Sequence, residues 1–209
     1  MVDFQSRDRR TRGRDDEDDE DDAAGNESTS DEAPVEPATD EGTTDDETPS
    51  SSQSAGVAVV TIADDRTVDA DPVGDAVVDA LDGHELVTRE LLGRNHDSVQ
   101  AAVDALVGRS DVDAVVTAGG TGVGREDVTV EAVHPLFEKA LPGFGELFRR
   151  RYYESVGTDV IATRATAGIA DGTPVFCLPD SVDGARLGVG EIIAEQVGRL
   201  GVSSDDATV

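Results

Sequence analysis

The stretch VDAVVTAGGTGVGREDVT, residues 112–129, joins an apolar run that is typical of a buried strand to a loop with four glycines. These glycines, between positions 119 and 124, can adopt positive φ values and carry no Cβ, so successive N–H groups could converge on an anion. Asp127 follows the loop and could orient such a ligand, or it could cap a helix that begins near Val128. The residues alone leave both roles open.

Two common phosphate-binding motifs do not match this loop. Gly119 and Gly124 have the spacing of a P-loop, but the next two residues are Arg and Glu instead of Lys and Ser or Thr. The dinucleotide fingerprint G-x-G-x-x-G fails as well, because the last three glycines of the loop are evenly spaced. An anion site at this loop would therefore be of another kind.

From Val57 onward, runs of β-branched residues alternate with amphipathic segments, which is the pattern of βαβ units and predicts a parallel sheet. Before the glycine loop we expect strands at 57–62, 84–91 and 112–118, with helices at 71–83 and 97–108. Helical spacing assigns eight side chains of those helices to the core: Val73, Val77, Val78, Leu81, Val99, Val103, Leu106 and Val107.

The chain after the glycine loop has a less regular pattern. We expect short helices near 130–137 and 143–154, a hairpin-like segment at 161–179, and a closing helix at 183–200. A core of about 150 residues has the size of one ordinary domain.

The composition is strongly acidic: 46 acidic residues face 17 basic ones, and the formal net charge is −29 at pH 7. The bias extends over the whole chain, and Lys139 is its single lysine. This composition predicts a halophilic protein that stays in solution at high salt, where the repulsion between acids is screened, although an ordinary acidic domain is the alternative. Nucleic-acid binding is disfavoured, because a phosphate backbone is attracted by patches of Lys and Arg.

The two ends of the chain differ from its middle. Residues 1–55 are built from Asp, Glu, Ser, Thr, Pro and Gly, so we expect a disordered acidic tail, followed by one domain at 56–201 and a disordered C-terminus at 202–209. Cys177 is the single cysteine, which excludes an intrachain disulfide and favours a reducing compartment. No apolar run is long enough for a membrane span or a signal peptide, so we expect a cytoplasmic protein without a membrane partner.

Several polar loops are expected to meet at one edge of the sheet, because parallel strands present their carboxyl ends together. These loops are 63–72, 92–97, 119–127 and the segment LPDS at 178–181. Acidic residues and glycines gather in them, so this edge is the predicted ligand-binding region.

The motifs in these loops resemble those of the MoaB/MogA family of molybdenum cofactor biosynthesis, the molybdopterin adenylyltransferases. The resemblance covers residues 57 to about 200 and is carried by TAGGTG with Asp127 five residues later, LPGFGELFR, TRATAG and VFCLP, in that order. It implies an α/β fold, a doubly wound, mostly parallel sheet with helices on both faces, and a homotrimer or homohexamer. The implied reaction joins ATP and molybdopterin, with Mg²⁺, to give adenylyl-molybdopterin and pyrophosphate. A molybdenum insertion protein is a further implied partner.

The resemblance also implies roles for individual residues. The glycine loop would hold phosphate or the phosphorylated arm of the pterin, and Asp127 would orient Mg²⁺ or its water. The implied substrate- or phosphate-binding residues are Arg66, Thr117, Gly119, Gly120, Thr121, Gly122 and Ser181, and the implied catalytic residues are Asp97 and Asp127. For Arg66 a structural salt bridge is the alternative, for the threonines a hydrogen bond to the backbone, and for Asp97 a helix N-cap.

Two positions depart from the family pattern. Arg94 and Asn95 stand where the family usually has an acidic pair, so a metal-binding carboxylate is missing there. Asp180 replaces the glycine of an LPGS segment. If that glycine has a positive φ or lets a phosphate approach, Asp180 adds a Cβ and a negative charge in the wrong place. The alternative function is therefore a non-catalytic molybdopterin-binding or assembly paralogue.

The acidic composition leads to a prediction about salt. Dilution below about 0.5 M salt should lower the melting temperature of the protein, because a longer screening distance exposes the repulsion between surplus acids. Thermal melts in a KCl series measure this effect. Equal melting temperatures at low and high salt would rule out the halophilic interpretation.

Overall fold

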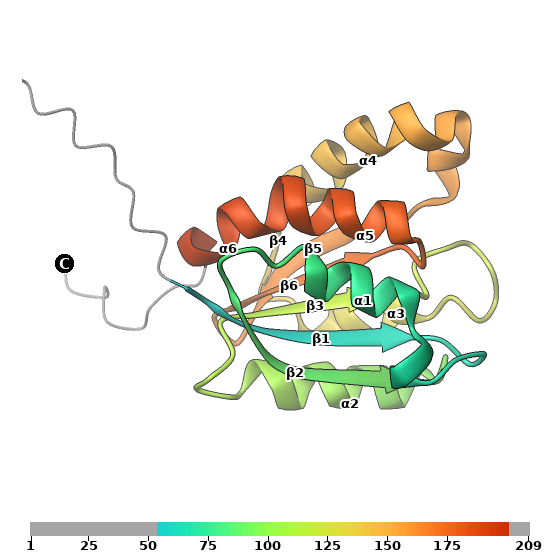
Figure 1. Ribbon diagram of the computed structural model, residues 1–209. Helices are drawn as coiled ribbons and strands as arrows, with labels where there is room; N and C mark the ends of the chain where they lie inside the picture. The colour runs from blue at the N-terminus through green and yellow to red at the C-terminus, as the bar shows by residue number, and fades with distance from the viewer. Residues whose placement is uncertain (1–53, 201–209) are drawn as a thin grey trace, which may run out of the picture. The chain divides into compact units, whose positions relative to one another are not determined.

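A six-stranded sheet with the order β2-β1-β3-β6-β5-β4 forms the centre of the computed structural model, which describes residues 54–200 (Figure 1). Nearly all of the two predicted tails therefore lies outside the described residues. The strands are β1 (Gly56–Ile62), β2 (Glu85–Leu92), β3 (Ala114–Ala118), β4 (Lys139–Ala140), β5 (Thr166–Ala170) and β6 (Thr173–Leu178). Four of them, β2, β1, β3 and β6, run parallel to one another, whereas β5 is antiparallel to β6 and to β4. The predicted α/β class with a mostly parallel sheet is confirmed.

The helices cover both faces of the sheet, as the doubly wound prediction requires. Figure 1 shows α1, α4, α5 and α6 on one side of the strands and α2 on the other. The helices are α1 (Pro72–Asp79), α2 (His96–Val107), α3 (Thr129–Val133), α4 (Pro142–Val156), α5 (Val182–Gly188) and α6 (Ala194–Leu200). Short 3₁₀ turns are η1 (Val68–Ala70), η2 (His134–Leu136) and η3 (Gly157–Ala162), and a π-helical turn, η4 (Val189–Ile193), joins α5 to α6.

Two hydrophobic cores lie on the two faces of the sheet. The core beneath α1, α4, α5 and α6 includes Phe148 and Phe176, and the core beneath α2 and α3 includes Val103 and Val175. Strands β1 and β3 are buried on both faces, which explains why they read as continuous apolar runs. Seven of the eight predicted inward side chains are buried, and the eighth, Val78, packs partly buried against the first core.

The predicted hairpin at 161–179 is confirmed for its second half, where β5 and β6 pair in antiparallel register. The turn between them contains Asp171 and Gly172, with φ values of 47° and 77°, and an Asp-Gly pair suits a two-residue turn that needs positive φ twice. The preceding residues form η3 instead of a strand, and the edge strand β4 was not predicted. Helix α1 also ends earlier than expected, at Asp79. Within residues 54–200, no helix has the length and apolar character needed to cross a membrane.

Packing at Gly188 generates a prediction about stability. A Cβ at this buried glycine would overlap the side chain of Leu178 and come within 3.3 Å of Phe148 Cε2. We expect Gly188→Ala to lower the free energy of unfolding by about 1–3 kcal/mol, as overpacked cores do. Gly190→Ala is the matched control in the same helical segment, because its Cβ would meet only Ala80 Cβ, at 3.9 Å. Denaturant unfolding at high salt measures both variants, and equal stabilities would contradict the packing described here.

Candidate functional site

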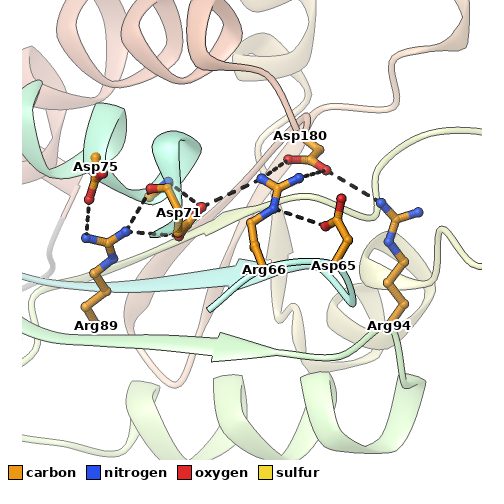
Figure 2. Close-up of polar contacts among 8 residues, drawn as sticks. Asp65, Arg66, Asp71, Asp75, Arg89, Arg94 and Asp180 are labelled. Carbon is orange, nitrogen blue, oxygen red and sulfur yellow. Dashed lines mark hydrogen bonds and ion pairs between the residues drawn. The ribbon is translucent and has the colours of Figure 1, made fainter. Parts of the chain in front are cut away.

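The loops at the carboxyl edge of the parallel strands are joined by a row of alternating charges, which we call the charge chain. Its members, in spatial order, are Asp75, Arg89, Asp71, Arg66, Asp180, Arg94 and Asp127. Figure 2 shows this row from Asp75 to Arg94. The residues come from α1, from β2, and from the loops that follow β1, β2, β3 and β6. The four loops that were expected to meet at one edge are thus in direct contact.

Asp71 is the buried anchor of the charge chain, with a side chain that is 0% exposed. Its Oδ1 accepts a hydrogen bond from the Gly74 amide at 3.1 Å, which caps α1, and its Oδ2 accepts one from Arg89 Nη2 at 3.0 Å. Burial opposes the charged form, but the Thr61 hydroxyl, the Gly74 amide and Arg89 together lower the pKa of Asp71 below its ordinary value. Asp71 therefore stabilises the fold when ionised, and this contribution is lost as the pH falls through the lowered pKa.

Arg66 links this anchor to the far loop. Its Nη1 and Nη2 donate to the two carboxylate oxygens of Asp180 at 2.9 and 3.1 Å, which is a bidentate contact. Its Nη1 also lies 3.7 Å from Asp71 Oδ1, and its Nε donates to Asp65 at 3.2 Å. The salt-bridge alternative for Arg66 is therefore present in the structure, and its predicted role in phosphate binding stays a prediction.

The two departures from the family pattern, Arg94 and Asp180, are partners of each other. Arg94 Nη2 lies 3.5 Å from Asp180 Oδ2, and Arg94 Nη1 lies 3.7 Å from Asp127 Oδ1. The charge of Asp180 is therefore compensated by two guanidiniums, which the sequence alone does not indicate. The backbone is not strained there either, because Asp171 is the only residue other than glycine with a positive φ in residues 54–200.

The glycine loop needs its first two glycines for backbone conformation. Gly119 and Gly120 have φ values of 111° and 65°, and a Cβ at either position would overlap Ile62 or Thr129. Thr129 also fastens this end of the loop, because its hydroxyl donates to the Gly119 carbonyl at 2.8 Å and its amide donates to the Gly120 carbonyl at 3.0 Å.

Asp127 closes the other end of the loop. Its Oδ2 accepts from the Gly124 amide at 2.8 Å, and its own amide donates to the Gly124 carbonyl at 3.2 Å. Helix α3 begins two residues later with Val128 at its N-cap and no side-chain cap. The helix-cap alternative for Asp127 is therefore wrong, and its carboxylate instead shapes the loop, with Oδ1 turned toward Arg94.

Arg164 holds the glycine loop through its carbonyl oxygens. Its guanidinium donates to the carbonyls of Thr121, Gly122 and Asp127 at 3.3, 2.7 and 2.9 Å, and its backbone amide donates to Thr121 as well. A salt bridge to Glu131 orients the side chain from the opposite direction. No sequence pattern indicates this role, although Arg164 lies in the quoted TRATAG motif. The contacts join residues about 40 positions apart, which no local pattern reveals.

Four amides in the middle of the loop are left without acceptors. Within residues 54–200, the N–H groups of residues 120–123 donate no hydrogen bond, and the hydroxyl of Thr121 is buried without a partner. Gly120 and Thr121 are buried. Gly122 is half-buried and Val123 is exposed. Buried donors are nearly always paired in folded proteins, so the donors of Gly120 and Thr121 are the candidates for an acceptor that a ligand supplies.

A hollow of about 420 Å³ opens beside the loop and is lined by Gly124, Asp127, Glu131 and Arg164, among others. A second hollow of about 490 Å³ adjoins Arg164 from the side of α4. Both volumes lie in the range of small-molecule sites. The surface next to the glycine loop therefore has room for a ligand larger than a single phosphate.

The remaining predicted site residues lie in different environments. Thr117 is buried in β3 and its hydroxyl donates to the Phe176 carbonyl at 3.4 Å, which is the backbone contact named as its alternative. Ser181 caps α5 by accepting from the Gly184 amide, and it also accepts from the Tyr152 hydroxyl. Asp97 is 96% exposed and contacts His96, while the N-cap of α2 is Asn95, so the cap alternative for Asp97 is wrong.

Comparison with known proteins places this chain in a family. A model of the probable molybdopterin binding domain matches residues 58–199. The molybdenum cofactor biosynthesis protein B of Bacillus subtilis is 38% identical over 145 residues, which cover 68% of this chain and 85% of that protein. The protein of the same name from Escherichia coli K12 is 34% identical over 143 residues, with 68% and 84% covered.

Solved structures agree with these relatives. A crystal structure of a molybdenum cofactor biosynthesis protein B is 35% identical, with a TM-score of 0.68 over 72% of this chain and 96% of that one. The tungsten cofactor synthesizing protein MoaB from Pyrococcus furiosus is 36% identical, with a TM-score of 0.63 over 69% and 93% of the two chains. The chain therefore belongs to the family of probable molybdopterin binding domains that includes the MoaB proteins.

Proposed function

We propose that this protein acts in molybdenum cofactor biosynthesis as a molybdopterin adenylyltransferase. In this reaction an oxygen of the phosphorylated arm of molybdopterin forms a bond to the α-phosphorus of ATP. The bond from that phosphorus to the bridging oxygen of the β-phosphate breaks, and pyrophosphate leaves. Family membership supports the pathway, and the observation that carries the site is the set of unpaired donors at residues 120–123.

The unpaired amides suit the phosphate groups of both substrates. Each amide is a fixed partial positive charge, and a phosphate oxygen accepts several such donors at once. The Thr121 hydroxyl adds a donor that rotates. Because Thr129 and Arg164 fix the carbonyls on the other side of the backbone, the amides require no reorganisation when a phosphate arrives.

Arg66 and Arg94 supply the charged part of the phosphate site. Both side chains are partly exposed, at 17% and 26%, and both lie at the same edge as the glycine loop. The charge chain nevertheless contains four carboxylates and three guanidiniums, so it has no surplus of positive charge. A nucleotide that brings its own cation is better suited to this site than a bare triphosphate.

The residues around Asp127 fit a Mg²⁺ ion that arrives on a phosphate, not a resident one. Within the part of the chain that the structure describes, no group of three or more potential metal ligands comes together. Mg²⁺ is commonly held by one or two carboxylates together with substrate phosphates, and Asp127 Oδ1 is the carboxylate oxygen that is not used by the loop. Such an ion would neutralise charge that develops on the phosphates.

The position of Arg94 supports a second candidate function. Its guanidinium faces the same Asp127 oxygen that would hold the ion, at 3.7 Å. If Arg94 keeps that place when substrates bind, the protein is a non-catalytic molybdopterin-binding or assembly paralogue. The proposed homotrimer or homohexamer, the molybdenum insertion protein as partner, and a cytoplasmic location are compatible with either function.

The direct test is a reaction with purified protein, molybdopterin, ATP and Mg²⁺ at high salt. Mass spectrometry detects the adenylylated pterin, and a coupled assay detects pyrophosphate. We expect both products to form in equal amounts and only when Mg²⁺ is present. Tight binding of molybdopterin without either product would support the paralogue instead.

Asp127→Asn should separate the metal role of this residue from its structural role. We expect a loss of about a hundredfold or more in single-turnover pyrophosphate release, because a carboxylate on a divalent ion is worth several kcal/mol. The free energy of unfolding should fall by no more than about 1 kcal/mol, since the Asn oxygen can still accept from Gly124. Glu126→Gln, an exposed neighbour with the same change in charge, is the control. Activity that survives Asp127→Asn would show that this carboxylate only shapes the loop.

Arg164 is predicted to be a positioning residue. Arg164→Gln removes most of the contacts to three carbonyls, so the hydrogen-bonded loop amides of Gly119, Gly124 and Asp127 should exchange hydrogen at least tenfold faster, and the KM for ATP should rise. Hydrogen exchange with mass spectrometry measures the loop directly. Arg150→Gln, on an exposed position of α4, is the control for lost charge. Unchanged exchange in the Arg164 variant would mean that the loop is held by Thr129 and Asp127 alone.

A further inference from the structure

We propose that the Asp180 carboxylate is a displaceable internal anion: it occupies the phosphate-binding side of Arg66 and Arg94, and a phosphate group must replace it to bind there. Asp180 would thus set the phosphate affinity of the site. The proposal rests on the proposed function for the identity of the ligand, but it concerns binding and not the reaction.

The first observation is that Asp180 accepts hydrogen bonds from the guanidinium nitrogens that a phosphate would use. Both terminal nitrogens of Arg66 donate to its two oxygens, and Arg94 Nη2 approaches one of those oxygens at 3.5 Å (Figure 2). The two oxygens of a carboxylate accept from a guanidinium in the same bidentate way as two oxygens of a phosphate do. No bidentate face of Arg66 remains for a second anion while this contact is closed.

The second observation is that the Asp180 carboxylate does not cap helix α5. Ser181 supplies the cap of that helix by accepting from the Gly184 amide at 3.2 Å, and the Tyr152 hydroxyl supports Ser181 at 2.9 Å. The Asp180 backbone is outside the positive-φ region. The side chain can therefore rotate away without opening the helix or straining the chain.

The third observation is that the two guanidiniums are held in place by other groups. Arg66 keeps its contacts to Asp65 and Asp71, and the Arg94 guanidinium keeps its contact to Asp127 Oδ1, at 3.7 Å. Asp180 itself is 22% exposed, so solvent is available to its carboxylate when it leaves. Displacement thus moves one short side chain, while the cationic residues stay at the edge of the glycine loop.

Displacement has a measurable consequence for affinity. A ligand that binds only the open state has an apparent affinity reduced by the fraction of molecules in that state. If the Arg66–Asp180 contact is closed in about nine molecules of ten, the apparent affinity for phosphate is about tenfold weaker than that of the open site. A multiply charged phosphate competes with this tethered carboxylate better than a singly charged anion does, so Asp180 also makes the site selective for charge.

The experiment measures binding of inorganic pyrophosphate by calorimetry to the full chain at constant high salt, without molybdopterin or ATP. We expect Asp180→Asn to bind pyrophosphate at least fivefold more tightly than the unmodified protein. Asp183→Asn, which removes the same charge three residues further on at an exposed position, should change the affinity less than twofold. Melting temperatures identify any variant that fails to fold, and Asp180→Gly provides a second, independent removal of the carboxylate.

A double variant tests whether the gain in pyrophosphate affinity depends on Arg66. Arg66→Gln in the Asp180→Asn background should abolish the gain, because the released guanidinium is what binds the phosphate. Equal or weaker binding by both Asp180 variants would overturn the proposal, as would a gain that survives Arg66→Gln. Tighter pyrophosphate binding together with absent adenylyl transfer would leave this inference standing and reject the proposed reaction.

Discussion

The bidentate contact between Arg66 and Asp180 joins loops that are 114 residues apart in the chain, and the other charges of the site are arranged around it. On one side Arg66 reaches toward the buried Asp71, which caps α1 and binds Arg89. On the other side Arg94 bridges Asp180 to the glycine loop through Asp127. In a chain with 46 acids and 17 bases, each of these guanidiniums is shared between carboxylates. Shared cations allow four loops to meet despite their excess of acidic residues.

The glycine loop is held by this charge chain through Asp127 and, separately, by Arg164. Arg164 binds the loop through carbonyl oxygens, and Asp127 closes it through the Gly124 amide. The groups left for a ligand are the amides of residues 120–123 and the Thr121 hydroxyl, which are donors of hydrogen bonds. The fold thus engages the carbonyl groups of the loop backbone in contacts within the protein and leaves the amides of residues 120–123 without an acceptor. This division of the backbone links the fold to the proposed phosphate chemistry.

Much of the fold could be predicted from the sequence, because it is encoded by local periodicity. The buried valines of α1 and α2, the strands β1 to β3 and the Asp171–Gly172 turn follow from spacing of apolar residues and from turn chemistry. The edge strand β4 consists of only two residues, both exposed, so it has no periodic pattern that a sequence could reveal. The location of the site at the carboxyl ends of the strands also follows from the parallel pattern.

The contacts inside the site could not be predicted in the same way. Arg94 and Asp180 looked like two independent losses, because a sequence shows the sign of each charge but not its partner. Their contact, and that of Arg164 with carbonyls some 40 residues earlier, depend on how the loops meet in three dimensions. The role of Asp127 could not be predicted from the sequence either. An Asp before a helix is commonly a cap, yet here its side chain folds back onto the loop that precedes it.

A crystal structure of the protein with bound ATP would test the central claim of this account most directly, through the positions of the phosphorus atoms. We predict phosphate oxygens within hydrogen-bonding distance of the amides of residues 120–123, with Arg66 on the phosphate and Asp180 turned away from it. Phosphates bound elsewhere, with the amides still unpaired and the Arg66–Asp180 contact closed, would contradict the account.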